Sequence, residues 1–226
     1  MWSVLWDIIP LGLGAAFTPS LLSMQILATS SPKWQWRSFM VFLGTAVAFG
    51  IACTVLFLGV MQLPTSSDAV NIVGGVIRLV VGVGFIVGAI ILFLPHPEAK
   101  AAFQEVVAKH VGKAKLPWFF GIAFVLSIKD VTSFALLVPG LHDIASGHLE
   151  IFEKGLLILI LFGLALLPVL IPPLWRIIRG EKANAGMKKL YDFTLDNQLV
   201  ILGVICSVFA VYCVVTAFGE HGFGLL

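Results

Sequence analysis

The chain has 226 residues, of which 59% are hydrophobic and only 12% are charged, and its formal net charge is +2. A water-soluble domain of this length needs a far more polar surface, so this composition excludes one. Several windows exceed the roughly 18 apolar residues that identify a membrane span. The sequence therefore predicts an all-α polytopic membrane protein.

We expect six transmembrane helices of about 20–26 residues each, a length that allows some tilt. In chain order they cover residues 4–29, 38–62, 70–95, 116–139, 151–175 and 197–219. The first basic residue is Lys33, so the N-terminus lacks the positive region of a signal peptide and the first span is expected to be kept.

The basic residues predict the orientation. Nearly all of them follow the first, third and fifth spans, whereas the opposite side has only Lys154. Because positively charged loops stay cytoplasmic, we expect a multi-pass protein of the bacterial inner membrane with both termini outside. The basic loop residues are Lys33, Arg37, Lys100, Lys109, Lys113, Lys115, Arg176, Arg179, Lys182, Lys188 and Lys189.

The spans divide into two groups of three, 1–95 and 116–226, joined by a connector at 96–115. Gly14-Ala15-Ala16-Phe17 in the first span resembles Gly121-Ile122-Ala123-Phe124 in the fourth, which places Ser20 opposite Ser127. Three spans per half make the two copies cross in opposite directions, so we expect two inverted three-helix repeats. The connector has apolar residues every four positions, which predicts either an amphipathic helix on the membrane surface or a solvated linker helix.

The fourth span contains a polar cluster near its middle. Lys129 and Asp130 lie there, and each charge at that depth costs about 2.5–3.5 kcal/mol on insertion scales, so such residues usually face a bundle interior and serve a function. Three hydroxyl side chains surround them: Ser127, Thr132 and Ser133. We interpret this cluster as the centre of a transport site.

Prolines interrupt two other spans. Pro19 lies between Thr18 and Ser20 near mid-membrane, where it frees a backbone carbonyl that a polar group must satisfy. This interruption predicts either part of a polar path or a tolerated kink. In the fifth span, closely spaced prolines predict a bend that either acts as a hinge or stays static. These are Pro168, Pro172 and Pro173.

A buried arginine in the third span needs a partner. Counting at 1.5 Å per residue puts Arg78 about 12 Å, and Asp130 about 13.5 Å, inside the outer boundary. Equal depth predicts an Arg78–Asp130 ion pair, with a purely structural pair or a snorkelling arginine as the alternatives. Lys129 would then remain for an anionic ligand group or a proton.

Catalytic and metal-binding motifs are absent from the sequence. It has no HExxH pair, Walker loop or dinucleotide-binding glycine motif, and we expect no histidine deep in a span. We therefore expect no enzyme activity, no metal site, no cofactor and no nucleic-acid partner.

Two segments resemble a known family. IPLGLGAAFTPSLLSMQILATS resembles the first span, and LSIKDVTSFALLVPGLHDIASG the fourth span, of the lysine-exporter (LysE) superfamily, and within it of the GAP or Sap group of glycolipid- or sulfolipid-addressing proteins. The fourth span of that group typically has an Asn-Pro-Lys-Asn run. This chain keeps the lysine but lacks the asparagine and proline, which leaves a broken fourth helix an open question. The resemblance implies export or surface delivery of a lipid or another amphipathic solute, in an envelope of the actinobacterial type.

Three functions fit these observations. The first is a transporter or flippase-like exporter for an anionic lipid or glycolipid, and the second is an exporter of small solutes such as amino acids or cations. The third is a non-transporting accessory subunit of a lipid-export complex. Expected partners are the bilayer, an anionic or amphipathic substrate, and either a second copy of the chain or envelope-assembly proteins.

Overall fold

The computed structural model describes residues 1–31, 33–62, 67–94 and 115–219. Within these ranges all regular secondary structure is helical. The helices are α1 (Trp2–Ala15), α2 (Pro19–Thr29), α3 (Trp34–Val60), α4 (Ser67–Phe93), α6 (Leu116–Ile128), α7 (Val131–Ser146), α8 (Ile151–Ala165), α9 (Leu167–Arg179), a 3₁₀ turn (Gly180–Lys182), α10 (Ala183–Asp196) and α11 (Gln198–Phe218).

Membrane-spanning helices of two kinds make up the described chain. Helix α3, the Ile72–Phe93 part of α4, and α11 are each long and apolar enough to cross a bilayer as single helices. Three further pairs pass the same test together but are bent at a short break: α1 and α2 by 66°, α6 and α7 by 63°, and α8 with the segment that follows it by 67°. Counting each bent pair as one span gives up to six, in the chain order expected from the sequence.

Local sequence accounts for the breaks. Pro19 is the first residue of α2, where its missing N–H and fixed φ suit a helix start. The fifth span bends at Leu166, and Pro168 is the second residue of the helix that follows, α9. The fourth span breaks without a proline: Asp130 caps α7 by accepting a hydrogen bond from the backbone N–H of Ser133. The question left open by the missing Asn-Pro pair is thus answered, because the fourth helix is broken.

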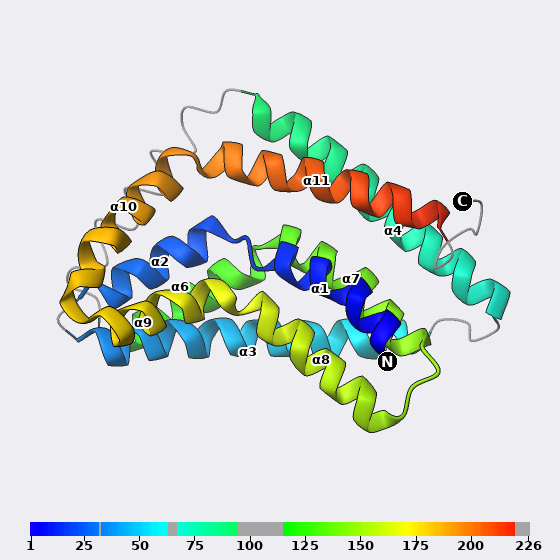
Figure 1. Ribbon diagram of the computed structural model, residues 1–226, viewed down its shortest axis with the longest axis horizontal. Coiled ribbons are helices and arrows are strands. Elements are labelled where there is room, and N and C mark those ends of the chain that lie inside the picture. Colours follow the sequence, from blue (N-terminus) through cyan, green and yellow to red (C-terminus); the bar gives the residue numbers. More distant parts are fainter. Residues whose placement is uncertain (32, 63–66, 95–114, 220–226) are drawn as a thin grey trace.

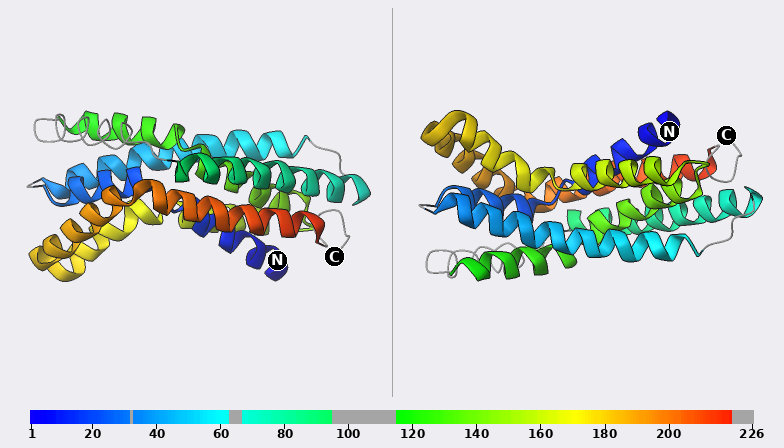
Figure 2. Two further views of the ribbon diagram at one scale, coloured as in Figure 1. Left: turned by 90° about the horizontal axis from the view of Figure 1, so that it is seen from above. Right: turned by 90° about the horizontal axis from the view of Figure 1, so that it is seen from below.

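The helices form an elongated bundle (Figure 1). Helices α4 and α11 pack along each other, α3 packs on α6, and α1 packs on α7 and α8. Met1 and the last turn of α11 lie at one end, which we call the terminal end (Figure 1). The α2–α3 connection, α9 and α10 lie at the opposite end, which we call the basic end because most of the described lysines and arginines are there (Figures 1 and 2).

Packing separates a buried core from an apolar outer surface. Ile8, Leu11, Leu137 and Leu161 are at most 1% exposed and hold α1, α7 and α8 together. On α11, by contrast, exposed valines recur every three or four residues, so one complete face of the helix is apolar and unpacked. Such a face suits contact with lipid tails. The exposed valines are Val200, Val204, Val208, Val211 and Val215.

Three expectations about boundaries need correction. The fourth span ends at Ser146 rather than at 139, because Pro139 lies inside α7 instead of ending it. Residues 140–146, expected in an external loop, are therefore helical. The stretch 183–196, expected largely as a cytoplasmic loop, forms α10. The predicted amphipathic connector at 96–115 lies outside the described residues, apart from Lys115.

Candidate functional site

The breaks in the first and fourth spans meet. Oγ1 of Thr18, the residue before α2, donates a hydrogen bond to Oδ2 of Asp130, the residue before α7, over 2.6 Å. The Ser133 hydroxyl lies 3.2 Å from that of Thr18 and 2.5 Å from the same Oδ2. We call this group of three side chains the break cluster.

The break cluster also satisfies a backbone carbonyl at the end of α1. Ala15 is the last residue of α1, and because the chain bends after it, with Thr18 extended, no backbone N–H of the described residues donates to its carbonyl. Oγ of Ser133 donates to that carbonyl over 2.7 Å, across from the other broken span. The Ser133 hydroxyl has one proton for two acceptors, the Ala15 carbonyl and Oδ2 of Asp130. When it donates to Ala15, the Thr18 hydroxyl is therefore the donor to Oδ2. Each break is thus completed by the other.

The remaining polar residues of the two spans lie around the break cluster. Lys129, at the end of α6, is exposed rather than buried among the helices. Ser127 is buried, but its hydroxyl donates to Ala123 of its own helix. Ser20 and Thr132 are half-buried, and neither makes a side-chain hydrogen bond to another described residue.

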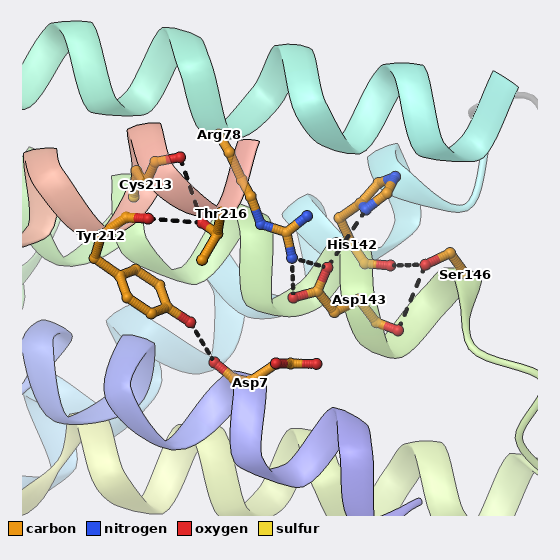
Figure 3. A network of polar contacts seen from close by, with 8 residues as sticks. All are labelled: Asp7, Arg78, His142, Asp143, Ser146, Tyr212, Cys213 and Thr216. Atoms are coloured by element: carbon orange, nitrogen blue, oxygen red, sulfur yellow. Dashed lines mark hydrogen bonds and ion pairs between the residues drawn. The ribbon is translucent and has the colours of Figure 1, made fainter. Parts of the chain in front are cut away.

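Arg78 does not pair with Asp130. Its guanidinium Nη2 donates to both carboxylate oxygens of Asp143, over 2.6 and 2.7 Å (Figure 3). Arg78 is 4% exposed and Asp143 is 8% exposed, so this ion pair is buried between α4 and α7. The predicted pairing was wrong because depth was counted from Pro139, taken as the helix end, and α7 continues for seven more residues.

Other polar groups surround this ion pair (Figure 3). Nδ1 of His142 lies 3.8 Å from Asp143, and His142 is itself only 5% exposed. Tyr212, on α11, donates to the backbone carbonyl of Asp7 over 3.3 Å. This group joins α1, α4, α7 and α11, and it corrects the expectation that His142 lies in an external loop.

A third polar group lies toward the basic end. Pro173 cannot donate to the carbonyl of Val169, and Nε2 of Gln25, on α2, donates to it instead over 2.7 Å. The same Nε2 donates to the Ser38 hydroxyl of α3 over 3.2 Å, so Gln25 ties three helices together. Arg176, near the end of α9, donates to the carbonyl of Thr29 at the end of α2, where a cation is favoured.

A protein-family model described as Sap, sulfolipid-1-addressing protein, matches residues 8–218, which is nearly the whole chain. The chain belongs to this family. No curated protein and no solved structure matches it. Membership in the Sap family indicates a role in lipid export or addressing, and the apolar helices make this Sap-family chain membrane-embedded. The match says nothing about the wider LysE superfamily, which stays a prediction.

Sequence reasoning found part of this site. It singled out all three residues of the break cluster, together with Pro19 and the bend near Pro168, whereas Pro172 and Pro173 lie beyond that bend, inside α9. It missed Asp143, His142 and Gln25. The signal for Asp143 was the apolar helical pattern that continues past Pro139. Within the described ranges of the Sap-family chain, no three His, Cys, Asp or Glu side chains are grouped to hold a metal ion.

Proposed function

We propose that this Sap-family chain is a membrane transporter that moves an anionic lipid or glycolipid, or a similar amphipathic solute, toward the cell surface. The observation that carries the proposal is the break cluster, in which two interrupted spans complete each other through side chains. Interrupted helices at membrane depth are tolerated where protein or a cavity satisfies their backbone, and in transporters they build the substrate site.

Contacts between helices support an inverted-repeat arrangement. If the bent pair α1–α2 corresponds to α6–α7, then α3 corresponds to α8–α9 and α4 to α11. Each half then packs its second span on the first span of the other half, as α3 does on α6, and as α8 and α9 do on α1 and α2. Helices α4 and α11, the third spans, pack on each other. A pseudo-two-fold axis between the halves produces this pattern.

Charge near the break cluster suggests how the substrate is recognised. The N-terminal ends of α2 and α7 meet there, and each carries a partial positive charge. Asp130 neutralises these ends by accepting the hydrogen bonds described above. Lys129 is the adjacent cation, and its exposed ammonium is the group we assign to the anionic part of the substrate. During transport the breaks separate and release Asp130 from Thr18.

Purified protein in lipid vesicles tests this proposal. The measurement is transfer of a fluorescent anionic lipid between leaflets, followed by chemical quenching from outside and normalised to folded protein. We expect Lys129→Gln to transfer poorly and Lys129→Arg to keep part of the activity. Lys188→Gln removes the same charge at an exposed position of α10 and serves as the matched control.

The other outcomes separate the competing functions. Wild-type transfer by Lys129→Gln would remove Lys129 from the mechanism. If the wild-type protein transferred no lipid above empty vesicles but exported an amino acid or a cation, the small-solute exporter would replace this proposal. If it transferred neither, the accessory-subunit function would replace it.

A further inference from the structure

A cavity of about 570 Å³ lies between α3 and α9 at the basic end. Its volume falls within the range of about 300–1,000 Å³ that is typical of ligand sites. Helix α2 forms its floor through Gln25, while Trp34 and Arg176 contribute to its lining nearest the basic end. We call this cavity the Trp34–Arg176 groove. Helices α3 and α9 spread apart toward the end at which α3 begins (Figure 2).

The groove opens sideways, where lipid would surround the bundle. Phe39, on α3, and Ile177, on α9, both line it, and they are 48% and 66% exposed. Apolar rims of this kind offer a small polar solute no hydrogen-bond partner, whereas an acyl chain can pass between the rims and the surrounding lipid tails without entering water. The side opening therefore favours a lipid over a water-soluble ligand.

Polarity changes along the length of the groove. Helix α3 runs inward from the basic end and α9 runs outward to it, so Trp34 and Arg176 are near the outer end, and Phe42 and Leu170 are deeper. Trp34 and Phe42 are eight residues apart, or about 12 Å along a helix. A headgroup would thus lie at the outer end, and its chain would follow the apolar walls inward.

The charged residues at the outer end select an anion. The Arg176 guanidinium lies 5.0 Å from the centre of the Trp34 ring, and this stacking holds it at the groove. An adjoining cavity of about 690 Å³ shares Trp34 and Gln35 with the groove and adds Lys33. Among the described residues, neither cavity is lined by an aspartate or a glutamate. Two cations without an acidic neighbour among the described lining residues complement a phosphate or sulfate group.

We infer that the Trp34–Arg176 groove binds a membrane lipid with an anionic headgroup, held by Arg176 and Lys33, with an acyl chain between α3 and α9. The role of this lipid as a transport substrate rests on the proposed function, whereas its binding in the groove does not. The groove is then the place where the lipid enters before it reaches the break cluster.

Photo-crosslinking of the purified full chain in nanodiscs tests this inference. The probes are phosphatidylglycerol and phosphatidylcholine, each with a diazirine in the acyl chain, and adducts are located by mass spectrometry. We expect phosphatidylglycerol to label the α3 and α9 segments that line the groove, and zwitterionic phosphatidylcholine to label them about tenfold less. Equal labelling by the two lipids would overturn the inference, because it would show ordinary contact with the bilayer.

Two pairs of variants separate the groove from its surroundings. Ile177→Trp fills the groove, and Ile178→Trp places the same side chain on an exposed site of α9 that does not line it. Arg176→Gln removes the lining charge, and Arg179→Gln removes an exposed charge one turn later. We expect the first member of each pair to lose phosphatidylglycerol labelling by about tenfold, and the second to keep it.

If Arg176→Gln fails to fold, Ile177→Trp still tests binding in the groove, since Ile177 is largely exposed. Wild-type labelling of folded Ile177→Trp would contradict binding in the groove. The labelling also distinguishes the two proposals. Groove labelling without lipid transfer would refute the transporter and keep the site, and transfer without groove labelling would do the opposite.

Discussion

Breaking the buried ion pair between Arg78 and Asp143 gives a quantitative test of the fold. Both side chains are at least 92% buried, and Nη2 of the arginine contacts both oxygens of the carboxylate. Removing one partner strands the other charge, at a cost of about 3–5 kcal/mol. This cost lowers the folding equilibrium constant roughly a hundred- to several-thousand-fold. We therefore expect Arg78→Met and Asp143→Leu each to destabilise the protein by an amount in this range.

Replacing both partners together leaves no stranded charge at this pair. Apolar replacement of a whole buried pair is often neutral, so the double variant Arg78→Met/Asp143→Leu is expected to regain most of the stability lost by each single variant. The measurement is reversible unfolding in mixed detergent micelles, followed by circular dichroism, with the coupling energy taken from the double-mutant cycle.

A second cycle with Asp130→Leu is the control. Asp130 bonds Thr18 and Ser133 rather than Arg78, so its effect should add to that of Arg78→Met without coupling. Strong coupling between Arg78 and Asp130, together with independent effects at Arg78 and Asp143, would refute the assigned helix register.

Two further predictions concern packing, and both use the same unfolding assay. Ser133→Ala should destabilise the protein by about 1–3 kcal/mol, because it leaves the Ala15 carbonyl without its short hydrogen bond. Ser127→Ala removes a hydrogen bond within one helix and should have little effect. Equal losses of stability in the two variants would contradict the role of the break cluster. Gly44→Ala should lower the stability of the protein by about 1–3 kcal/mol, because the added Cβ would lie 2.4 Å from a carbonyl oxygen of α6. Gly59→Ala is the control, since its Cβ would lie in open space. Wild-type stability of Gly44→Ala would show that α3 and α6 are not in close contact.

Hydrophobic runs and composition were enough to predict the helical class and the order of the spans. These two features predict the spans because a bilayer requires long apolar helices. The same logic located Pro19 and the cluster at Lys129 and Asp130, since a proline or a charge in an apolar run is costly wherever it lies. These features are local, and local sequence contains them.

Partners across the bundle could not be predicted from local sequence. Arg78 and Asp143 are 65 positions apart, and Thr18 and Asp130 are 112 apart, so their meeting depends on how the helices shift along one another. One wrong helix end, at Pro139, moved the expected partner of Arg78 by 13 residues along the chain. The repeat alignment set Ser20 opposite Ser127, whereas the residues directly before the second helix at each break are Thr18 and Asp130.

Under the proposed function, the first and fourth spans separate at their breaks during lipid transport. A disulfide between Thr18→Cys and Ser133→Cys tests it most directly, because their hydroxyl oxygens lie 3.2 Å apart and a disulfide needs about 2.05 Å between sulfurs. Native Cys53, Cys206 and Cys213 are replaced by alanine, and lipid transfer between vesicle leaflets is measured on one sample before and after reduction. We expect transfer to stop when the disulfide forms and to resume when it is reduced. Equal transfer by the oxidised and reduced forms, above the level of empty vesicles, would contradict separation at the breaks.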